Sequence, residues 1–210
     1  ALALRARRPA ARLALVEREA TLGGNHTWSF HEGDVPETAR DWVDPLVTRR
    51  WPAYDVRFPG LERTLQHAYA TIPSARVDAA VRERLSGAPG CEVITGEAAV
   101  AVSARTVRLE DGRTLEGTLV VDARGPGRRE ASASAGFQKF VGLELRLERR
   151  TAPLRPVVMD ATVAQADGFR FVYVLPLDED RVLVEDTYFS DTDRLDRETL
   201  RGRALAYAQE

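Results

Sequence analysis

The sequence predicts a mixed α/β fold in which a dinucleotide-binding domain is interleaved with a β-sheet domain. Three observations predict it: an apolar run ending in an acidic residue near the start, a helix followed by short strands in the middle, and a strand-rich last third. The 210 residues suffice for one large or two smaller domains, at about 150 residues per domain. A composition of 44% hydrophobic and 30% charged residues excludes a disordered chain.

The first residues have the pattern of a dinucleotide-binding unit without its first strand. Residues 1–8 are rich in Ala, Leu and Arg and end at Pro9, which favours a short helix. The apolar run Leu13–Val16 then predicts a strand, and Glu17 follows it directly. In such a unit, an acid at this place accepts hydrogen bonds from ribose hydroxyls. An apolar strand that ends in Glu also occurs without a cofactor, and these residues leave both interpretations open.

Both ends of the sequence suggest a portion of a longer protein. The chain begins at Ala1 without a signal-peptide pattern, and its single methionine is Met159. Near the other end, Leu200, Ala204 and Tyr207 keep a helical spacing, and neither Gly nor Pro follows them. We therefore expect truncation at both ends, with the first strand and the Gly-rich turn of the dinucleotide-binding unit lying upstream.

The middle of the chain continues the α/β pattern. Ser74 is expected to cap a helix that has Val77, Val81 and Leu85 on one face. Four strand-like segments follow it: Cys91–Thr95, Ala98–Val102, Thr106–Leu109 and Thr114–Val121. The last of them leads into residues 122–125, and ligands bind at the carboxyl ends of strands in open α/β sheets. The sequence Gly-Pro-Gly at 125–127 imitates a phosphate loop, but a Glu at position 130 and a weak helix signal argue against one.

Two stretches form the expected second domain. Residues 23–73 show little periodicity but many aromatic side chains, including Trp28, Trp42 and Trp51. Tryptophans usually lie in a core or a domain interface, and they also suit the wall of an apolar pocket. The last third holds four strand-like segments: Phe137–Leu147, Val157–Ala164, Phe169–Leu177 and Arg181–Phe189. The expected domains are residues 1–22 with 74–128, and residues 23–73 with 129–210.

Two adjacent acids, Glu185 and Asp186, interrupt the last of these strands. Neighbouring side chains of a strand point to opposite faces, so Glu185 lies with Thr187 and Asp186 lies with Tyr188. A carboxyl among apolar neighbours has a raised pKa and can donate a proton near neutral pH. The alternative is that both acids pair with arginines or lie at a sheet end. Asp160 is a third acid in an apolar strand, and a structural acceptor is the simpler interpretation of it.

Charge and residue counts exclude other classes of protein. The 30 basic and 32 acidic residues give a net charge of −2, without the basic excess of a nucleic-acid-binding protein. The single cysteine, Cys91, excludes an internal disulfide, and with three histidines it forms no zinc-like spacing, so no metal site is predicted. No apolar run approaches the roughly 18–20 residues that cross a bilayer.

Five segments resemble, in order and in spacing, the bacterial lycopene β-cyclase family. They are Gly23–His31, Val56–Pro59, Gly136–Gly142, Met159–Val163 and Leu183–Thr187. The resemblance covers essentially the whole chain. Plant relatives have Phe-Leu-Glu-Glu-Thr where this chain has Leu-Val-Glu-Asp-Thr, so the first acid is kept and the second differs.

The resemblance implies a flavoprotein of the p-hydroxybenzoate-hydroxylase-like fold, with an FAD-binding and a substrate-binding domain. It implies reduced FAD as the cofactor and NAD(P)H as the reductant. By position it implies that the catalytic residues are Glu185 and Asp186. Glu185 is then the source or relay of the proton, and reduced flavin either stabilises the cation or is the immediate donor. The cofactor-binding residues that it implies are Glu17, Gly24, Asp122, Arg124 and Gly125, and the substrate-binding residues are Trp28 and Phe171.

The implied activity is acid-initiated cyclisation of the ψ-ends of lycopene to β-rings in carotenoid biosynthesis, a non-redox isomerisation. The implied enzyme class is an intramolecular lyase. We expect a cytoplasmic protein in peripheral contact with the cytoplasmic membrane, where the polyene dissolves. The 210 residues alone are expected to bind FAD poorly and to be inactive. An FAD-dependent redox enzyme of the same fold, such as an aromatic hydroxylase or an isoprenoid reductase, is the main alternative. A non-catalytic β-rich binding domain is the other.

Overall fold

The computed structural model describes residues 1–125, 136–148 and 153–209, and the chain divides into two compact units. The first unit comprises Ala1–Arg50 and Ala70–Arg129, and the second comprises Trp51–Tyr69 and Glu130–Glu210. The two units thus alternate along the sequence. Their boundaries differ from the expected ones, because residues 23–50 and 70–73 belong to the first unit instead of the second.

The hydrophobic core of the first unit explains this difference. Val43, Leu46 and Ile72 are buried in one cluster with Leu85, which ends helix α3 (Ser74–Leu85). Aromatic and apolar residues of the 23–50 stretch therefore pack on the helix that follows it in the chain. The sequence shows little periodicity here because the stretch is built of single turns and short strands.

The first unit has small sheets around α3. Strand β1 (Leu13–Glu17) pairs in parallel with β7 (Cys91–Thr95), as a dinucleotide-binding unit requires. Its other helices are α1 Leu2–Arg7 and α2 Arg40–Val43, with 3-10 turns at Glu32–Asp34, Glu37–Ala39 and Asp44–Leu46. Its other strands are β2 Thr27–His31, β3 Arg49–Trp51, β6 Tyr69–Pro73, β8 Ala99–Val102, β9 Thr106–Leu109 and β10 Thr114–Glu116. They form the sheets β2-β6-β3 and β10-β9-β8.

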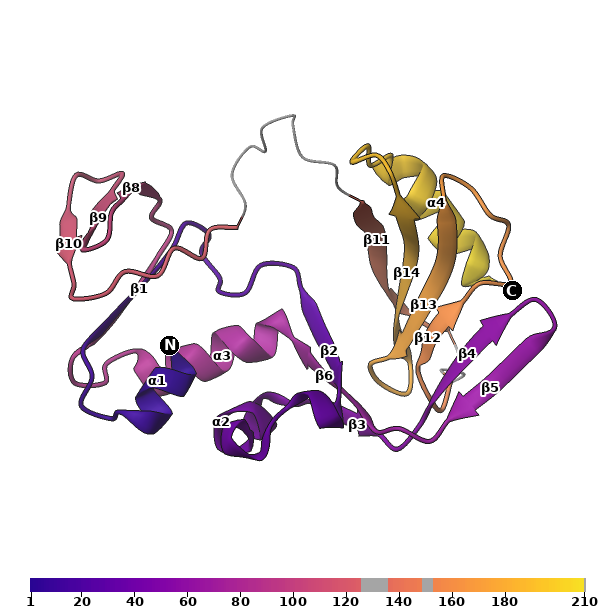
Figure 1. Ribbon diagram of the computed structural model, residues 1–210, viewed down its shortest axis with the longest axis horizontal. Helices are drawn as coiled ribbons and strands as arrows, with labels where there is room; N and C mark the ends of the chain where they lie inside the picture. Colours follow the sequence, from indigo (N-terminus) through magenta and orange to yellow (C-terminus); the bar gives the residue numbers. More distant parts are fainter. Residues whose placement is uncertain (126–135, 149–152, 210) are drawn as a thin grey trace. The chain divides into compact units, whose positions relative to one another are not determined.

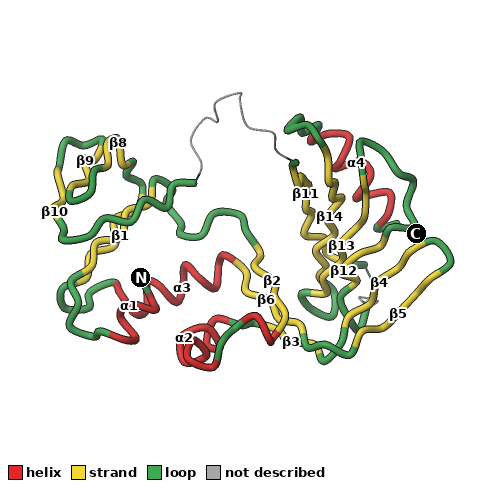
Figure 2. Tube along the Cα trace, viewed as in Figure 1, coloured by secondary structure: helices red, strands yellow, loops and turns green. Residues whose placement is uncertain are grey.

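Two local expectations for the first unit are wrong. Pro73 takes the N-cap position of α3, so Ser74 is the first helical residue and caps nothing with its side chain. The strand expected over 114–121 ends at Glu116, and residues 117–125 run as a loop (Figure 2). Leu119 and Val121 are 77% and 78% exposed. The described residues offer this segment no neighbouring strand, and a strand without a ladder partner does not form. Positions 126, 127 and 130 lie outside the described residues.

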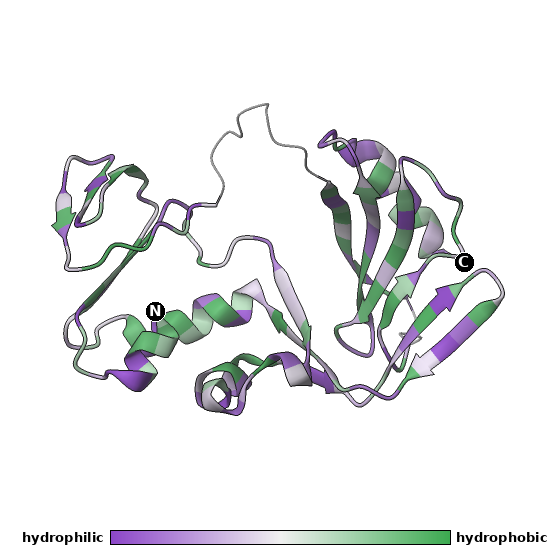
Figure 3. Cartoon of the chain, in the orientation of Figure 1, coloured by the Kyte–Doolittle hydropathy of each residue, from purple (hydrophilic) through white to green (hydrophobic). Residues whose placement is uncertain are grey.

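A six-stranded sheet organises the second unit, in the order β11-β14-β13-β12-β4-β5 (Figure 1). Its strands are β4 Tyr54–Phe58, β5 Leu61–Leu65, β11 Phe137–Arg146, β12 Val157–Asp160, β13 Phe169–Pro176 and β14 Arg181–Ser190. Helix α4 (Arg197–Tyr207) packs on one face through Ala204, which is fully buried against valines of the sheet. Figure 3 shows hydrophobic stretches along β13 and β14 that are interrupted by hydrophilic positions. The four strands expected in this part of the chain are therefore confirmed, although β12 is shorter than expected.

The only lysine of the sequence fastens the loop between β14 and α4. Lys139 is 8% exposed on β11. Its Nζ donates to the backbone oxygens of Thr192 at 3.1 Å and Arg194 at 2.6 Å, and it lies 2.8 Å from an Asp167 carboxylate oxygen. A buried ammonium needs such a complete set of oxygen partners, so this loop has a fixed course beside the sheet.

Within the described residues, no helix combines the length and apolarity that crossing a bilayer demands. The same residues contain no group of three or more His, Cys, Asp or Glu side chains arranged to hold a metal ion.

Candidate active site

Strand β14 sends its two adjacent acids to opposite faces of the sheet, as expected from strand periodicity. On the first face, Glu185 has Gly142 of β11 and Tyr173 of β13 directly opposite. On the second face, Asp186 has Val141 and Val172 opposite. We call these the Glu185 face and the Asp186 face. The Asp186 face is the one that α4 covers, since Val172 and Val184 pack with α4 residues.

Asp186 is fully buried and fully paired. Its Oδ1 accepts from Arg170 Nε at 2.6 Å, and its Oδ2 accepts from the Tyr188 hydroxyl at 2.7 Å. The same hydroxyl accepts from Arg203 Nη1 of α4 at 2.6 Å. The four side chains therefore connect the sheet to α4 through short, charge-assisted hydrogen bonds. For Asp186, the arginine-paired alternative of the sequence analysis is the correct one.

Asp160 belongs to a second polar connection of the same kind. Its Oδ2 accepts from the Tyr207 hydroxyl of α4 at 2.7 Å, and its Oδ1 accepts from the Thr162 backbone N–H at 3.0 Å. Burial acts against the charge, but hydrogen bonds from Thr162 and Tyr207 hold the pKa of the Asp160 carboxyl below its usual value. Asp160 is thus a structural acceptor, as the simpler interpretation held.

Glu185 has a different environment. Its half-buried carboxyl has no hydrogen bond or ion pair with any residue in the described part of the chain, and Leu183 and Thr187 flank it along β14. Burial without a partner disfavours the charged form and raises the pKa of Glu185 to about 7. Near neutral pH, a large fraction of the molecules therefore carries a protonated Glu185. Such a carboxyl can donate a proton.

Aromatic side chains cover the Glu185 face beyond the acid. Phe169 and Phe189 stack with ring centroids 6.2 Å apart and planes 8° apart, and the ring of Phe171 lies within 5.9 Å of both centroids. Phe140 is 45% exposed on the neighbouring strand. The Thr187 hydroxyl is buried among them and has no hydrogen-bond partner within the described ranges. The face thus combines one unpaired acid with an apolar aromatic surface.

Of these residues, sequence reasoning named Glu185 and Phe171 as site residues and missed Gly142, Phe140 and Phe169. The even spacing along β14 could have added Thr187 and Phe189, since both share the face of Glu185. Gly142 could not be found in this way, because its place opposite Glu185 depends on the pairing register of two strands about 40 residues apart.

The predicted cofactor-binding residues all lie in the first unit. Glu17 ends β1, and its Oε1 accepts from the Glu19 backbone N–H at 3.0 Å. Gly24 has a φ of 60°, which agrees with the tight turn expected there.

Asp122 and Arg124 form an exposed pair in the loop after β10. Arg124 donates to both carboxylate oxygens of Asp122, at 2.8 and 2.7 Å, and these bonds lower the pKa of Asp122 to about 2. Arg124 also donates to the Ala99 carbonyl at 3.0 Å. Gly125 follows with a φ of 87°. The expectation that these residues follow directly on a strand is wrong, but they do lie together.

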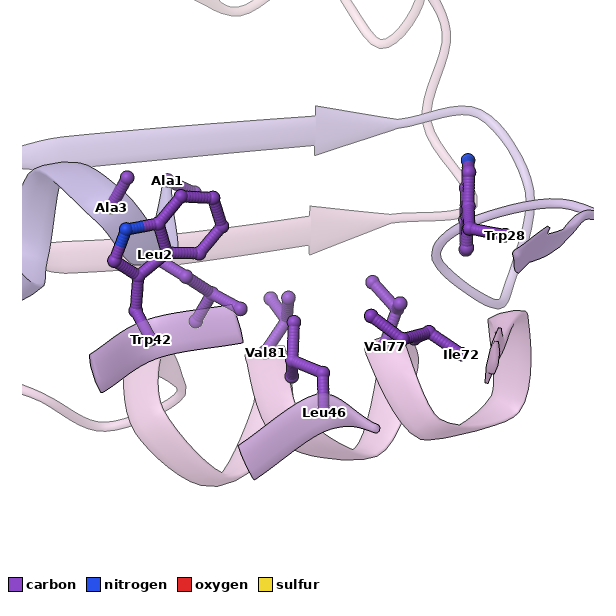
Figure 4. Close-up of a pocket in the computed structure, with 9 residues that line it drawn as sticks. All are labelled: Ala1, Leu2, Ala3, Trp28, Trp42, Leu46, Ile72, Val77 and Val81. Carbon is purple, nitrogen blue, oxygen red and sulfur yellow. The ribbon is translucent and has the colours of Figure 1, made fainter. Parts of the chain in front are cut away.

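Trp28 lies at one end of an apolar pocket of about 400 Å³ in the first unit (Figure 4). Trp42 stands at the other end, beside Ala1, Leu2 and Ala3. The pocket between the two tryptophans is lined by Leu46, Ile72, Val77 and Val81. Trp28 is 41% exposed and packs against His26, with ring centroids 5.7 Å apart. The two predicted substrate-binding residues, Trp28 and Phe171, therefore belong to different units.

Comparison with solved structures defines the class of fold. The chain is similar to PqsL of Pseudomonas aeruginosa, described as a probable FAD-dependent monooxygenase, with a TM-score of 0.65 and 17% identity over 99% of this chain and 62% of that one. It is also similar to 2-methyl-3-hydroxypyridine-5-carboxylic acid oxygenase, with a TM-score of 0.64 and 13% identity over 99% of this chain and 62% of that one. The fold is therefore the mixed α/β fold of such monooxygenases, as predicted.

Sequence comparison defines the family. The family model described as "Lycopene cyclase protein" matches residues 1–210, so the chain belongs to the lycopene cyclase family. It is 40% identical over 208 residues to the lycopene beta-cyclase of Pantoea ananas, covering 99% of this chain and 53% of that protein. It is 38% identical over 216 residues to that of a Paracoccus strain, covering 100% of this chain and 53% of that protein. The chain thus spans about half the length of the curated relatives that it matches.

Proposed function

We propose that this protein is a lycopene β-cyclase that converts the linear ψ-ends of lycopene to β-rings by acid-initiated cyclisation. One observation carries the proposal: a carboxyl with a raised pKa, Glu185, stands without a partner on an aromatic face. The names of the relatives support it. The reaction class is an intramolecular lyase, because the product has the same atoms and the same oxidation state as the substrate.

The chemistry requires one proton in and one proton out. A proton added to the terminal alkene leaves a tertiary cation, the neighbouring double bond attacks it and closes the ring, and loss of a ring proton forms the β-ring. Glu185 gives the first proton, and the proton lost at the end restores the balance. A protonated acid in an apolar environment is suited to this role because water does not take up the proton before the substrate does.

The aromatic side chains serve the positive charge that develops. Ring faces attract cations and provide no nucleophile that could trap one. Phe140, Phe171 and Phe189 share the face of Glu185. Phe189 lies further along β14 than the acid, and Phe140 and Phe171 lie opposite Thr187 on the neighbouring strands.

We infer that the substrate lies over the exposed rings of Phe140, Phe169 and Phe189. Phe171 is 5% exposed and packs against Phe169 and Phe189, and it stays a proposed substrate-binding residue. Trp28 stays a proposed substrate-binding residue of the first unit.

Asp186 has a positioning role in this proposal instead of the predicted catalytic one. Its carboxylate lies on the face opposite Glu185 and is paired with Arg170 and Tyr188. A fully paired, fully buried carboxylate on the far side of a strand does not reach the reacting atoms. Its bonds hold β14 in place and thereby fix the backbone that carries Glu185.

FAD fits the first unit at Glu17. This acid lies at the carboxyl end of the parallel pair β1 and β7, and the Glu19 N–H orients its carboxylate. We infer that Glu17 holds the adenosine ribose. Gly24, Asp122, Arg124 and Gly125 are the other proposed contacts, with the Asp122–Arg124 pair acting as one neutral unit. When bound, reduced FAD, with NAD(P)H as the proposed reductant, would supply an electron-rich ring able to stabilise positive charge.

The chemistry of the substrate leads to a proposal for location. Lycopene is a hydrocarbon that dissolves in membranes, so a protein that acts on it must take it from one. We propose a cytoplasmic protein that contacts the cytoplasmic membrane peripherally.

The proposal is tested by Glu185→Gln in the full-length enzyme, expressed in a lycopene-accumulating host. The change keeps the size of the side chain and removes the acid, so we expect β-ring formation to fall at least about 100-fold, the lower end of a typical acid contribution. Pigment analysis measures it. Near-normal cyclisation by this variant would refute the assignment of Glu185.

The matched control is Glu144→Gln. Glu144 lies on the same face of β11 but is ion-paired with Arg181 at 2.8 Å and exposed. The Glu144→Gln variant should retain cyclisation. The same assay separates the redox alternative, because an oxygenase or reductase consumes NAD(P)H in proportion to product, whereas a cyclase needs reductant only to keep FAD reduced.

A further inference from the structure

Gly142 is an unusual residue for its place in the sheet. It lies in the interior of β11, a strand of ten residues, where glycine costs conformational entropy and contributes no packing. Its φ lies outside the left-handed region, so the backbone there accepts any residue. A glycine that the backbone does not require often marks the close approach of another group. The group that approaches is the residue directly opposite, Glu185.

The side chain of Glu185 occupies the space that a larger residue would fill. A Cβ atom added to Gly142 would lie 3.1 Å from Glu185 Cγ, 3.2 Å from Glu185 Oε1 and 3.3 Å from Leu183 Cδ1. All three distances are shorter than ordinary van der Waals contact between such atoms. The acid therefore leans from β14 across to β11, and its carboxyl lies over the Gly142 backbone.

We propose that Gly142 is a positioning residue, whose missing side chain leaves the space that holds the Glu185 carboxyl and sets the direction in which it presents its proton. The catalytic consequence rests on the proposed function, whereas the contact itself does not. A methyl group at position 142 would push the carboxyl away from β11, on the side where Tyr173 of β13 lies opposite Glu185.

Few charged groups near Glu185 could change its titration independently of this displacement. From β13, Tyr173 faces Glu185, and the Tyr173 and Tyr69 hydroxyls lie 3.3 Å apart. From β11, Glu144 lies next to Gly142 on the same face, and Arg181 of β14 is its ion-pair partner. A methyl group adds no charge to this set. Any change in the titration of Glu185 then comes from the displacement of its carboxyl.

The first test compares Gly142→Ala with Gly202→Ala in the full-length enzyme. Gly202 lies exposed on α4, and a Cβ added there meets nothing within 4 Å. We expect Gly142→Ala to lower kcat about 10- to 100-fold with little change in KM, as for a misplaced catalytic group. Cyclisation needs protonated Glu185 and declines as pH rises through its pKa, so a displaced carboxyl in a changed environment should move this decline to a different pH. Gly202→Ala should leave both unchanged.

The second test does not depend on activity. The thermal midpoint of unfolding is compared for wild type, Gly142→Ala, Glu185→Ala and the double variant. With Glu185 present, the added methyl should lower Tm. In the Glu185→Ala background the contacts with Glu185 are gone and only the contact with Leu183 Cδ1 remains, so the same methyl should lower Tm less than it does with Glu185 present.

The outcomes are distinct. Additive shifts in Tm, or a folded Gly142→Ala with wild-type kcat and pH profile, overturn the positioning role of Gly142. If Glu185→Gln cyclises normally while the Tm shifts are coupled, the proposed function fails and the contact between Gly142 and Glu185 stands.

Discussion

The two faces of the sheet in the second unit give neighbouring carboxyl groups opposite environments. On the Asp186 face the carboxylate has an arginine and a tyrosine hydroxyl as partners, under the cover of α4. On the Glu185 face the acid stands alone among aromatic and apolar side chains. One step along the strand separates a paired structural carboxylate from an unpaired carboxyl with a raised pKa. The difference teaches that the supply of partners, and not burial alone, decides what a carboxyl in a sheet can do.

The largest effect on stability should follow from removing the paired carboxylate of the Asp186 face. Asp186→Ala leaves the Arg170 guanidinium, itself 7% exposed, without its counter-charge. We expect the free energy of unfolding to fall by about 3–5 kcal/mol, measured by chemical denaturation. The neighbouring truncation Glu185→Ala removes no such partner and should cost less than about 1 kcal/mol. Equal losses for the two variants would remove the distinction between the faces.

The next effect is a pH dependence that belongs to the unpaired face. The pKa of Glu185 rises from 4.5 to about 7 on folding, so between these pH values the folded state binds the extra proton. Stability should therefore fall as pH rises through this window, by at most about 3 kcal/mol. Denaturation of wild type and Glu185→Gln at several pH values measures it, and the variant should lack this component. Parallel profiles for the two proteins would contradict an unpaired, buried Glu185.

A smaller effect tests the bridge between the paired face and α4. Tyr188→Phe removes the hydroxyl that donates to Asp186 and accepts from Arg203. The loss should be about 1–3 kcal/mol, since the ring stays and only hydrogen bonds to charged groups are lost. Thermal unfolding measures it. Cyclisation should persist in this variant wherever the protein is folded, and its loss in folded protein would place this hydroxyl in the chemistry.

The strand-rich part of the fold was predictable because its period is two. Alternation along residues 181–189 was sufficient to separate Glu185 from Asp186, and β13 and β14 have nearly the predicted bounds. Residues 23–50 resisted prediction because they pack as turns and short strands around α3, where contacts distant in sequence decide the fold. The segment 117–121 has the composition of a strand, but pairing, which composition does not contain, decides whether it forms one.

The candidate site was predictable to the same extent. Glu185 could be singled out because an acid in an apolar strand is uncommon. The lack of a partner for Glu185 could not be predicted. Arg170 reaches Asp186 and not Glu185 because of the register of β13 on β14. The glycine opposite Glu185 likewise belongs to the pairing of strands and not to any motif.

The buried Lys139 gives these 210 residues a chemical property of practical use. With its ammonium held by Asp167 and two backbone carbonyls, the sequence has no solvent-exposed lysine. Amine-directed reagents will therefore find no exposed lysine side chain within these residues while the protein is folded. Labelling of Lys139 becomes a report on the opening of the loop between β14 and α4, with no engineered probe.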